Sequence, residues 1–240
     1  MKVFLKAAYQ PYKWLFFIPI LVLLTLFCGL ICILFAFIFG PDTADSLAVL
    51  WSRLVCFFIP VRVRIKGRNN YDTDKAYVVV VNHRSMIDIP VIHGWLGLKI
   101  KWVIKKELKK IPVFGSACES IGCIYVDRFD RFSAIKSIQD AKKKMSKRAS
   151  VLFFPEGTRT RDGSTAKFKK GAFYFAKETG LSVLPITIKN TMKILPSDSL
   201  DLFPGTAEII VHPPVDISNK DEEEFPYLIE EIRQTIINAL

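Results

Sequence analysis

The longest uncharged stretch of the sequence lies close to its beginning. From Trp14 to Pro41 there are 28 residues without a charged side chain, and 23 of them are hydrophobic. As a helix this stretch would be about 42 Å long, more than the roughly 30 Å hydrocarbon core of a bilayer. A cleaved signal peptide has a shorter apolar region, of about 7–15 residues. The stretch therefore predicts a membrane helix.

A second apolar run, Leu47 to Pro60, has only 14 residues and contains Arg53. It is too short and too polar to cross a bilayer comfortably by itself. Basic residues lie before the first run and after the second, and such flanks belong on the cytoplasmic side of a membrane. We expect residues 1–60 to form a two-helix hairpin that anchors a cytoplasmic domain of residues 61–240.

Beyond residue 60 the sequence changes to short β-rich runs that alternate with amphipathic helical patterns. This alternation is typical of an α/β domain. We expect a mixed sheet of about seven strands covered by helices. The expected strands are Val61–Lys66, Tyr77–Val81, Lys101–Ile104, Ile124–Val126, Val151–Phe154, Val183–Ile188 and Ala207–Val211. The expected helices are Met86–Leu98, Ser133–Lys147, Lys169–Glu178 and Glu223–Ala239.

The chain carries 34 Lys and Arg against 23 Asp and Glu, a formal net charge of +11. This excess fits a partner that carries phosphate: nucleic acid, an anionic membrane surface or a phosphorylated substrate. Because no aromatic-basic platform or helix-turn-helix pattern accompanies the charge, nucleic acid is the least expected of the three. The six lysines between Lys99 and Lys110 would suit anionic lipid headgroups.

The five cysteines are an odd number without a paired zinc-type spacing. We expect them to be reduced and structural, in a chain whose working part faces a reducing compartment. No spacing of His, Cys, Asp and Glu predicts a metal site.

The segment that most restricts the chemistry is residues 82–88, Asn-His-Arg-Ser-Met-Ile-Asp, directly after an expected strand. Open α/β sheets bind ligands at the carboxyl ends of their strands. The spacing allows Asp88 to fix one ring nitrogen of His83 and leave the other to take a proton from an alcohol. Asp88 could instead cap the next helix. The His-x4-Asp pattern alone also occurs by chance in unrelated chains.

Two further polar segments end expected strands. Residues 154–159 read Phe-Pro-Glu-Gly-Thr-Arg, and residues 122–128 read Gly-Cys-Ile-Tyr-Val-Asp-Arg. A glycine turn can present backbone N–H groups and Arg159 to a phosphate. One base and two arginines at strand ends suit an alcohol that carries a phosphate, and this chemistry requires no protein nucleophile.

These three segments, followed by Val183-Leu184-Pro185-Ile186, resemble the ordered motifs of the glycerolipid acyltransferases. The resemblance covers about residues 60–215 and is greatest to the bacterial 1-acyl-sn-glycerol-3-phosphate acyltransferases. It implies transfer of a fatty acyl group from acyl-CoA or acyl carrier protein to the sn-2 hydroxyl of lysophosphatidate, giving phosphatidate without a further cofactor. It also implies the bacterial inner membrane, with the catalytic domain on the cytoplasmic side.

By motif position, the resemblance makes His83 the general base and Asp88 the residue that orients it, without a covalent acyl-enzyme. The substrate-binding residues that it implies are Lys105, Arg128, Glu156, Gly157, Thr158 and Arg159, with the two arginines on the phosphate. Two alternatives remain: an acyltransferase for another lysophospholipid or a glycerol-phosphate acceptor, and a non-catalytic scaffold that binds anionic lipid. Only the scaffold would tolerate replacement of His83. The oligomeric state is not predicted.

Overall fold

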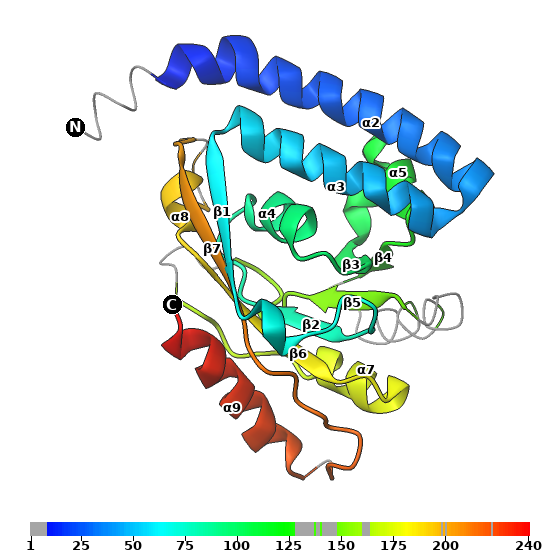
Figure 1. Ribbon diagram of the computed structural model, residues 1–240, viewed down its shortest axis with the longest axis vertical. Helices are drawn as coiled ribbons and strands as arrows, with labels where there is room; N and C mark the ends of the chain where they lie inside the picture. Colours follow the sequence, from blue (N-terminus) through cyan, green and yellow to red (C-terminus); the bar gives the residue numbers. More distant parts are fainter. Residues whose placement is uncertain are drawn as a thin grey trace.

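A computed structural model describes residues 9–127, 137, 140, 148–159, 164–197, 199, 201–221 and 223–240. In this part of the chain a seven-stranded sheet lies between two layers of helices (Figure 1). The strands are β1 (Val61–Lys66), β2 (Val78–Val81), β3 (Ile100–Lys105), β4 (Ile124–Val126), β5 (Ser150–Phe153), β6 (Val183–Lys189) and β7 (Gly205–Val211). All seven predicted strands are confirmed, with boundaries that differ by at most two residues.

The sheet is mixed, as the sequence predicts, and its strand order is β1-β7-β6-β2-β5-β3-β4. Strands β6, β2, β5, β3 and β4 are parallel neighbours. Strand β7 runs antiparallel to β6, and β1 runs parallel to β7. The five parallel strands therefore bring their carboxyl ends to one edge of the sheet, where the polar segments begin.

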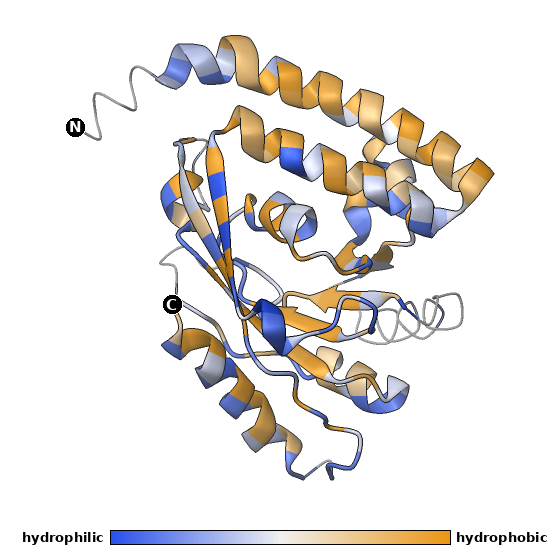
Figure 2. Ribbon diagram, in the orientation of Figure 1, coloured by the Kyte–Doolittle hydropathy of each residue, from blue (hydrophilic) through white to orange (hydrophobic). Residues whose placement is uncertain are grey.

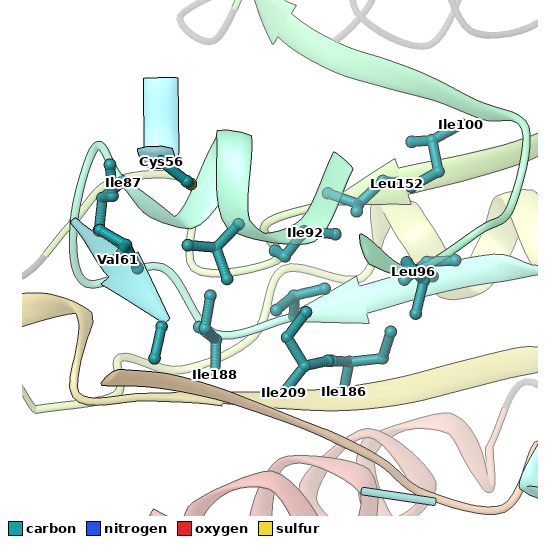
Figure 3. Packing of buried hydrophobic residues seen from close by; sticks show 14 of the residues in the cluster. Cys56, Val61, Ile87, Ile92, Leu96, Ile100, Leu152, Ile186, Ile188 and Ile209 are labelled. Atoms are coloured by element: carbon teal, nitrogen blue, oxygen red, sulfur yellow. The ribbon is translucent and has the colours of Figure 1, made fainter. Parts of the chain in front are cut away.

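The central strands are buried on both faces, which explains why they are continuously apolar. All four valines of β2 are fully buried. Val79 and Val81 belong to a core cluster with Ile92 of the helical layer on one face. Val78 and Val80 belong to a second cluster on the other face. Figure 3 shows the first cluster, in which side chains of β6 and β7 pack beneath those of the helical layer.

The helices are α2 (Ile18–Phe39), α3 (Pro41–Phe58), α4 (Asp88–Trp95), α5 (Phe114–Ser120), α7 (Gly171–Thr179), α8 (Thr191–Ile194) and α9 (Phe225–Asn238). Helices α2, α3 and α4 cover one face of the sheet, and α7 and α9 cover the other (Figure 1). Three predicted helices are confirmed as α4, α7 and α9. The fourth, Ser133–Lys147, falls almost wholly outside the described residues. The sequence patterns missed α5 and α8, which are too short to show a helical period.

Within the described residues, one helix is long and apolar enough to cross a membrane, and it spans Tyr9–Phe39. It comprises a π-helical turn, Lys13–Phe17, and α2. Beyond its first turns this helix is mostly apolar in Figure 2, whereas α3 is mixed. Only 17% of its most apolar stretch is buried, unlike a helix in the core of a soluble protein. A long helix that is both apolar and exposed suits association with a membrane.

The predicted membrane anchor is wrong in its second helix. Helix α3 does fold back beside α2, but its buried residues lie on one face, from Ala44 to Cys56. Val55 and Cys56 belong to the same core cluster as β1 and α4, and Arg53 Nε donates a hydrogen bond to the Gly94 carbonyl of α4. The apolar run after residue 46 therefore packs on protein. The division into domains at residue 60 stays a prediction.

The inner face of α2 is fitted closely to the rest of the molecule. The indole Nε1 of Trp51 in α3 donates to Thr25 Oγ1 at 3.1 Å. A Cβ atom on Gly29 would lie 2.7 Å from Cγ1 of Val113, which immediately precedes α5. Glycine at this position therefore allows α2 to approach α5.

Candidate active site

The predicted pair of His83 and Asp88 is brought together just beyond β2. The two residues lie in the loop before α4 and at the first residue of α4. The Nδ1 atom of His83 lies 2.9 Å from Oδ2 of Asp88. Asp88 is fully buried, while the His83 side chain is 12% exposed. Because an ionised carboxylate only accepts hydrogen bonds, Nδ1 carries the proton and Nε2 is free to accept one.

The same carboxylate oxygen also shapes the loop between the two residues. Oδ2 of Asp88 accepts hydrogen bonds from the backbone N–H groups of Arg84 and Ser85, both at 2.8 Å. The loop is held further by Asn82, whose side chain exchanges two hydrogen bonds with the backbone of Ile188 in β6. Asp88 thus holds both the ring of His83 and the turn before α4. It does not cap α4 as the alternative expected, because the N-cap residue is Ile87 and no side-chain capping bond is made there.

Glu156 holds the histidine loop from a neighbouring strand end. Its Oε1 accepts a hydrogen bond from the backbone N–H of His83 at 2.8 Å, and its Oε2 accepts one from Ala166 at 3.1 Å. Burial raises the pKa of Glu156, although these two hydrogen bonds act in the opposite direction. The sequence predicts a substrate-binding role for Glu156 but did not reveal its bond to His83, because the two residues are 73 positions apart.

The turn after β5 needs a glycine and presents a basic edge. Gly157 has φ +81°, in the region that favours glycine. A Cβ atom there would lie 2.8 Å from Nζ of Lys169, so this ammonium group lies over the turn. Thr158 is exposed and Arg159 is half-buried. Lys169 is a cation that the sequence motifs did not single out, although it belongs to a basic cluster directly before α7.

The other two predicted substrate-binding residues follow the neighbouring strands. Lys105 ends β3, pairs in register with Val126 of β4 and has a half-exposed side chain 3.5 Å from Glu107. It therefore lies at the same edge of the sheet as His83. Arg128 lies outside the described residues.

An apolar cavity adjoins the histidine loop. Its volume is about 480 Å³, and its walls come from α2, α3, α4, β3 and α5. Met86 and Ile87, which follow the loop of His83, line it together with Trp102. A concave, largely apolar cavity with few polar groups is typical of a site for an apolar ligand.

In the described part of the chain, no group of three His, Cys, Asp or Glu side chains could hold a metal ion. All five cysteines are free thiols: three are buried and two, Cys118 and Cys123, are partly exposed and line the cavity. The arrangement near His83 thus combines an oriented imidazole, strand-end cations and an apolar cavity. It can deprotonate an alcohol and hold an anion and an apolar chain nearby.

Comparison with known proteins agrees with this chemistry. Residues 62–189, just over half of the chain, match the family model described as Acyltransferase. A chloroplastic 1-acyl-sn-glycerol-3-phosphate acyltransferase of Arabidopsis thaliana is 36% identical over 177 residues, which cover 73% of this chain and 49% of that protein. The 1-acyl-sn-glycerol-3-phosphate acyltransferase of Helicobacter pylori is 31% identical over 157 residues, or 65% of this chain and 66% of that protein.

The chain spans about half the length of the first plant and algal relatives that it matches. The chain spans a larger share of a related protein whose structure has been solved. The crystal structure of the 1-acyl-sn-glycerophosphate (LPA) acyltransferase PlsC from Thermotoga maritima superposes with a TM-score of 0.81 and 25% identity. The superposition covers 98% of this chain and 95% of that one. The motif order, the fold and the matched family model lead to one conclusion: the chain belongs to the acyltransferase family.

Proposed function

We propose that this protein is a lysophosphatidate acyltransferase, which transfers a fatty acyl group to the sn-2 hydroxyl of 1-acyl-glycerol-3-phosphate and forms phosphatidate. The observation that carries the proposal is the His83–Asp88 pair at a strand end, 2.9 Å apart, beside an apolar cavity. The similar proteins are 1-acyl-sn-glycerol-3-phosphate acyltransferases, which supports the same substrate class.

The proposed mechanism is a direct attack on a thioester. Nε2 of His83 takes the proton of the sn-2 hydroxyl while that oxygen adds to the thioester carbonyl carbon. The oxyanion then collapses, the carbon–sulfur bond breaks, and the thiolate takes the proton back from the imidazolium. Asp88 stabilises the imidazolium through Nδ1. A positioned base contributes on the order of 10²–10⁴ in rate.

The apolar cavity is the proposed place for a fatty chain during transfer. Met86 and Ile87, which follow the loop of His83, line it, so we place the carboxyl end of a bound chain at this wall, near His83. The cavity could accept the chain of the donor, acyl-CoA or acyl carrier protein, or that of the lysolipid.

The proposed phosphate site lies at the basic edge of the same sheet end. Arg159 is the primary candidate, with Lys105 as the cation from the neighbouring strand. Arg128 keeps the role that its motif implies. Lys169, which lies over Gly157, adds a further cation at this edge. Glu156, Gly157 and Thr158 would shape the acceptor site, the first by holding the loop of His83.

The decisive experiment supplies purified protein with labelled oleoyl-CoA or oleoyl carrier protein and a panel of lysolipids that differ only in headgroup. We expect phosphatidate from lysophosphatidate and little product from uncharged acceptors. Preference for another lysophospholipid or for glycerol phosphate would favour the alternative acceptors. Binding to anionic vesicles without any transfer would favour the scaffold.

The proposed location is the bacterial inner membrane, with the outer face of α2 in lipid and the catalytic domain on the cytoplasmic side. Large side chains such as Phe27 and Phe37, 64% and 89% exposed, lie on the unpacked face of α2. Protease treatment of inside-out and right-side-out membrane vesicles tests the orientation. Cleavage of the catalytic domain only in inside-out vesicles is expected, and the opposite pattern would contradict it.

A further inference from the structure

A line of aromatic contacts extends inward from His83. The imidazole of His83 is stacked on the ring of Phe154, with centroids 3.8 Å apart and planes 13° from parallel. Phe154 follows β5 directly. Phe154 also contacts the indole of Trp102, from the neighbouring strand β3, at 5.9 Å between centroids and 41° between planes. Trp102 is only 5% exposed.

Trp102 is held in turn by a second histidine. Its indole Nε1 donates a hydrogen bond to Nδ1 of His93 at 2.9 Å, and both side chains are buried. Because an indole N–H can only donate, Nδ1 of His93 carries no proton. The proton of the neutral ring is therefore on Nε2, which faces Oδ1 of the buried Asp45 at 3.6 Å.

The neutral state of His93 agrees with its surroundings. Burial, together with the charge of Lys101 on β3, lowers the pKa of His93 to about 4. The charged or titratable groups that act on the ring are thus Asp45 from α3, at 3.6 Å, and the charge of Lys101, whose Nζ is itself bound to Asp42 and the Ile121 carbonyl. Near neutral pH the ring remains an acceptor for Trp102.

We propose that His93 and Trp102 are positioning residues, which hold Phe154 against His83 and so fix the plane of the reacting imidazole. This inference rests on the proposed role of His83 as the base. The hydrogen bond to Asp88 holds one atom of the ring, Nδ1. Rotation of a histidine ring about χ2 is soft, so one bond at Nδ1 leaves the direction of Nε2 loosely defined. Stacking on a supported Phe154 removes that freedom.

The size of the effect follows from the sensitivity of proton transfer to geometry. A misplacement of about 1 Å can reduce a rate on the order of 10²-fold. Loss of the support behind Phe154 should displace Nε2 by less than this, so we expect a reduction in kcat of about tenfold. Trp102 and His93 also line the apolar cavity. A role limited to the cavity wall would instead alter KM for the acyl donor and its chain-length preference.

The test compares two substitutions of His93. His93→Leu removes the acceptor for Trp102, whereas His93→Asn can place an amide oxygen near the position of Nδ1. We expect His93→Leu to lower kcat about tenfold with both KM values within about twofold, and His93→Asn to recover most of the loss. His212→Leu is the matched control, because that ring also hydrogen-bonds a neighbour, Thr187 Oγ1, at 2.9 Å. It should keep the parent kcat.

A double variant tests whether the contacts act in one line. Phe154→Leu should lower kcat by a similar factor, and adding His93→Leu should then cost little more, because residues that act through one contact are not additive. If His93→Leu does not fold, Trp102→Phe takes its place in the test, because it removes the indole N–H together with part of the ring that contacts Phe154. Independent, multiplying losses would overturn the proposal, as would a parent kcat in His93→Leu or an effect confined to KM of the acyl donor.

A chemical readout separates this inference from the proposed function. Diethyl pyrocarbonate modifies accessible imidazoles, and peptide mass spectrometry gives the rate at His83 alone. With one ring face less firmly covered, His83 should react at least twofold faster in His93→Leu and Phe154→Leu than in the parent. If His83→Ala keeps its activity, the proposed function fails even when this change occurs. If the rates are unchanged, the positioning proposal fails whatever the role of His83.

Discussion

Asp88 holds both the ring of His83 and the loop before α4, and a single oxygen, Oδ2, serves both roles. Two different replacements of Asp88 can separate them. Oδ2 accepts three hydrogen bonds, from His83 Nδ1 and from the backbone N–H groups of Arg84 and Ser85. In Asp88→Ala, two backbone donors in a buried loop lose their acceptor. A buried donor left unsatisfied costs about 1–3 kcal/mol. We therefore expect Asp88→Ala to lose about 2–6 kcal/mol of stability, and activity on the order of 10²-fold or more.

Asp88→Asn should behave differently. The two backbone N–H groups select the amide oxygen, not the NH2 group, at the Oδ2 position. His83 then keeps a proton on Nδ1 and an acceptor for it, and only the negative charge is lost. The difference between charged and neutral hydrogen bonds is about 1–2 kcal/mol, or about 5–30-fold in rate.

The assay measures kcat/KM for labelled acyl transfer and Tm in detergent for the parent and both variants. The expected order of activity is parent, Asp88→Asn, then Asp88→Ala, and only Asp88→Ala should have a much lower Tm. Equal loss of activity in the two variants would mean that the backbone donors do not fix the amide. An unchanged Tm in Asp88→Ala would refute the role of the carboxylate in holding the loop before α4.

Three further changes test other parts of the site and core. Arg159→Ala should lower the preference for lysophosphatidate over monoacylglycerol about 10–100-fold, while the exposed Arg148→Ala leaves the ratio unchanged; equal ratios in both variants would remove Arg159 from the phosphate site. Gly157→Ala forces alanine into φ +81°, which costs about 1–2 kcal/mol, and should reduce turnover. The control Gly180→Ala, at φ +69° away from the site, should keep the parent turnover. Equal turnover in the two variants would show that the turn at Gly157 is not critical. Burial raises the pKa of Asp45 to about 6, whereas the pKa of an aspartate in an unfolded chain is about 4. The protonated side chain therefore favours the folded state below pH 4, and this contribution to stability is lost as the pH rises through 6. The parent should therefore lose about 3 kcal/mol of folding stability between pH 4 and pH 6, and Asp45→Asn should not. An identical pH dependence of Tm in the parent and the variant would contradict this.

The sheet was predictable because its strands are short runs of residues that must be buried on both faces. Val78–Val81 is one such run, and no solvent-facing alternation obscures it. The pairing of His83 with Asp88 was also predictable, since both lie within one loop. What α3 packs against was not, because an amphipathic helix has the same pattern on lipid and on protein. The hydrogen bond from Arg53 of α3 to Gly94 of α4 shows that α3 packs on protein.

The supports of the candidate site could not be predicted from local sequence. Glu156 reaches His83 across the sheet, and Phe154 reaches it by stacking. His93 interacts with Trp102 on a neighbouring strand and with Asp45 on α3. Each of these contacts depends on strand order and helix packing, which local periodicity does not specify.

The most direct test of the account is the initial rate of phosphatidate formation from lysophosphatidate and labelled oleoyl-CoA by the parent, His83→Ala and His212→Ala proteins. We predict steady turnover by the parent and His212→Ala, and a loss on the order of 10²–10⁴-fold in His83→Ala, which should still fold and bind vesicles. Near-parent turnover by a folded His83→Ala protein would contradict the central claim that His83 is the base.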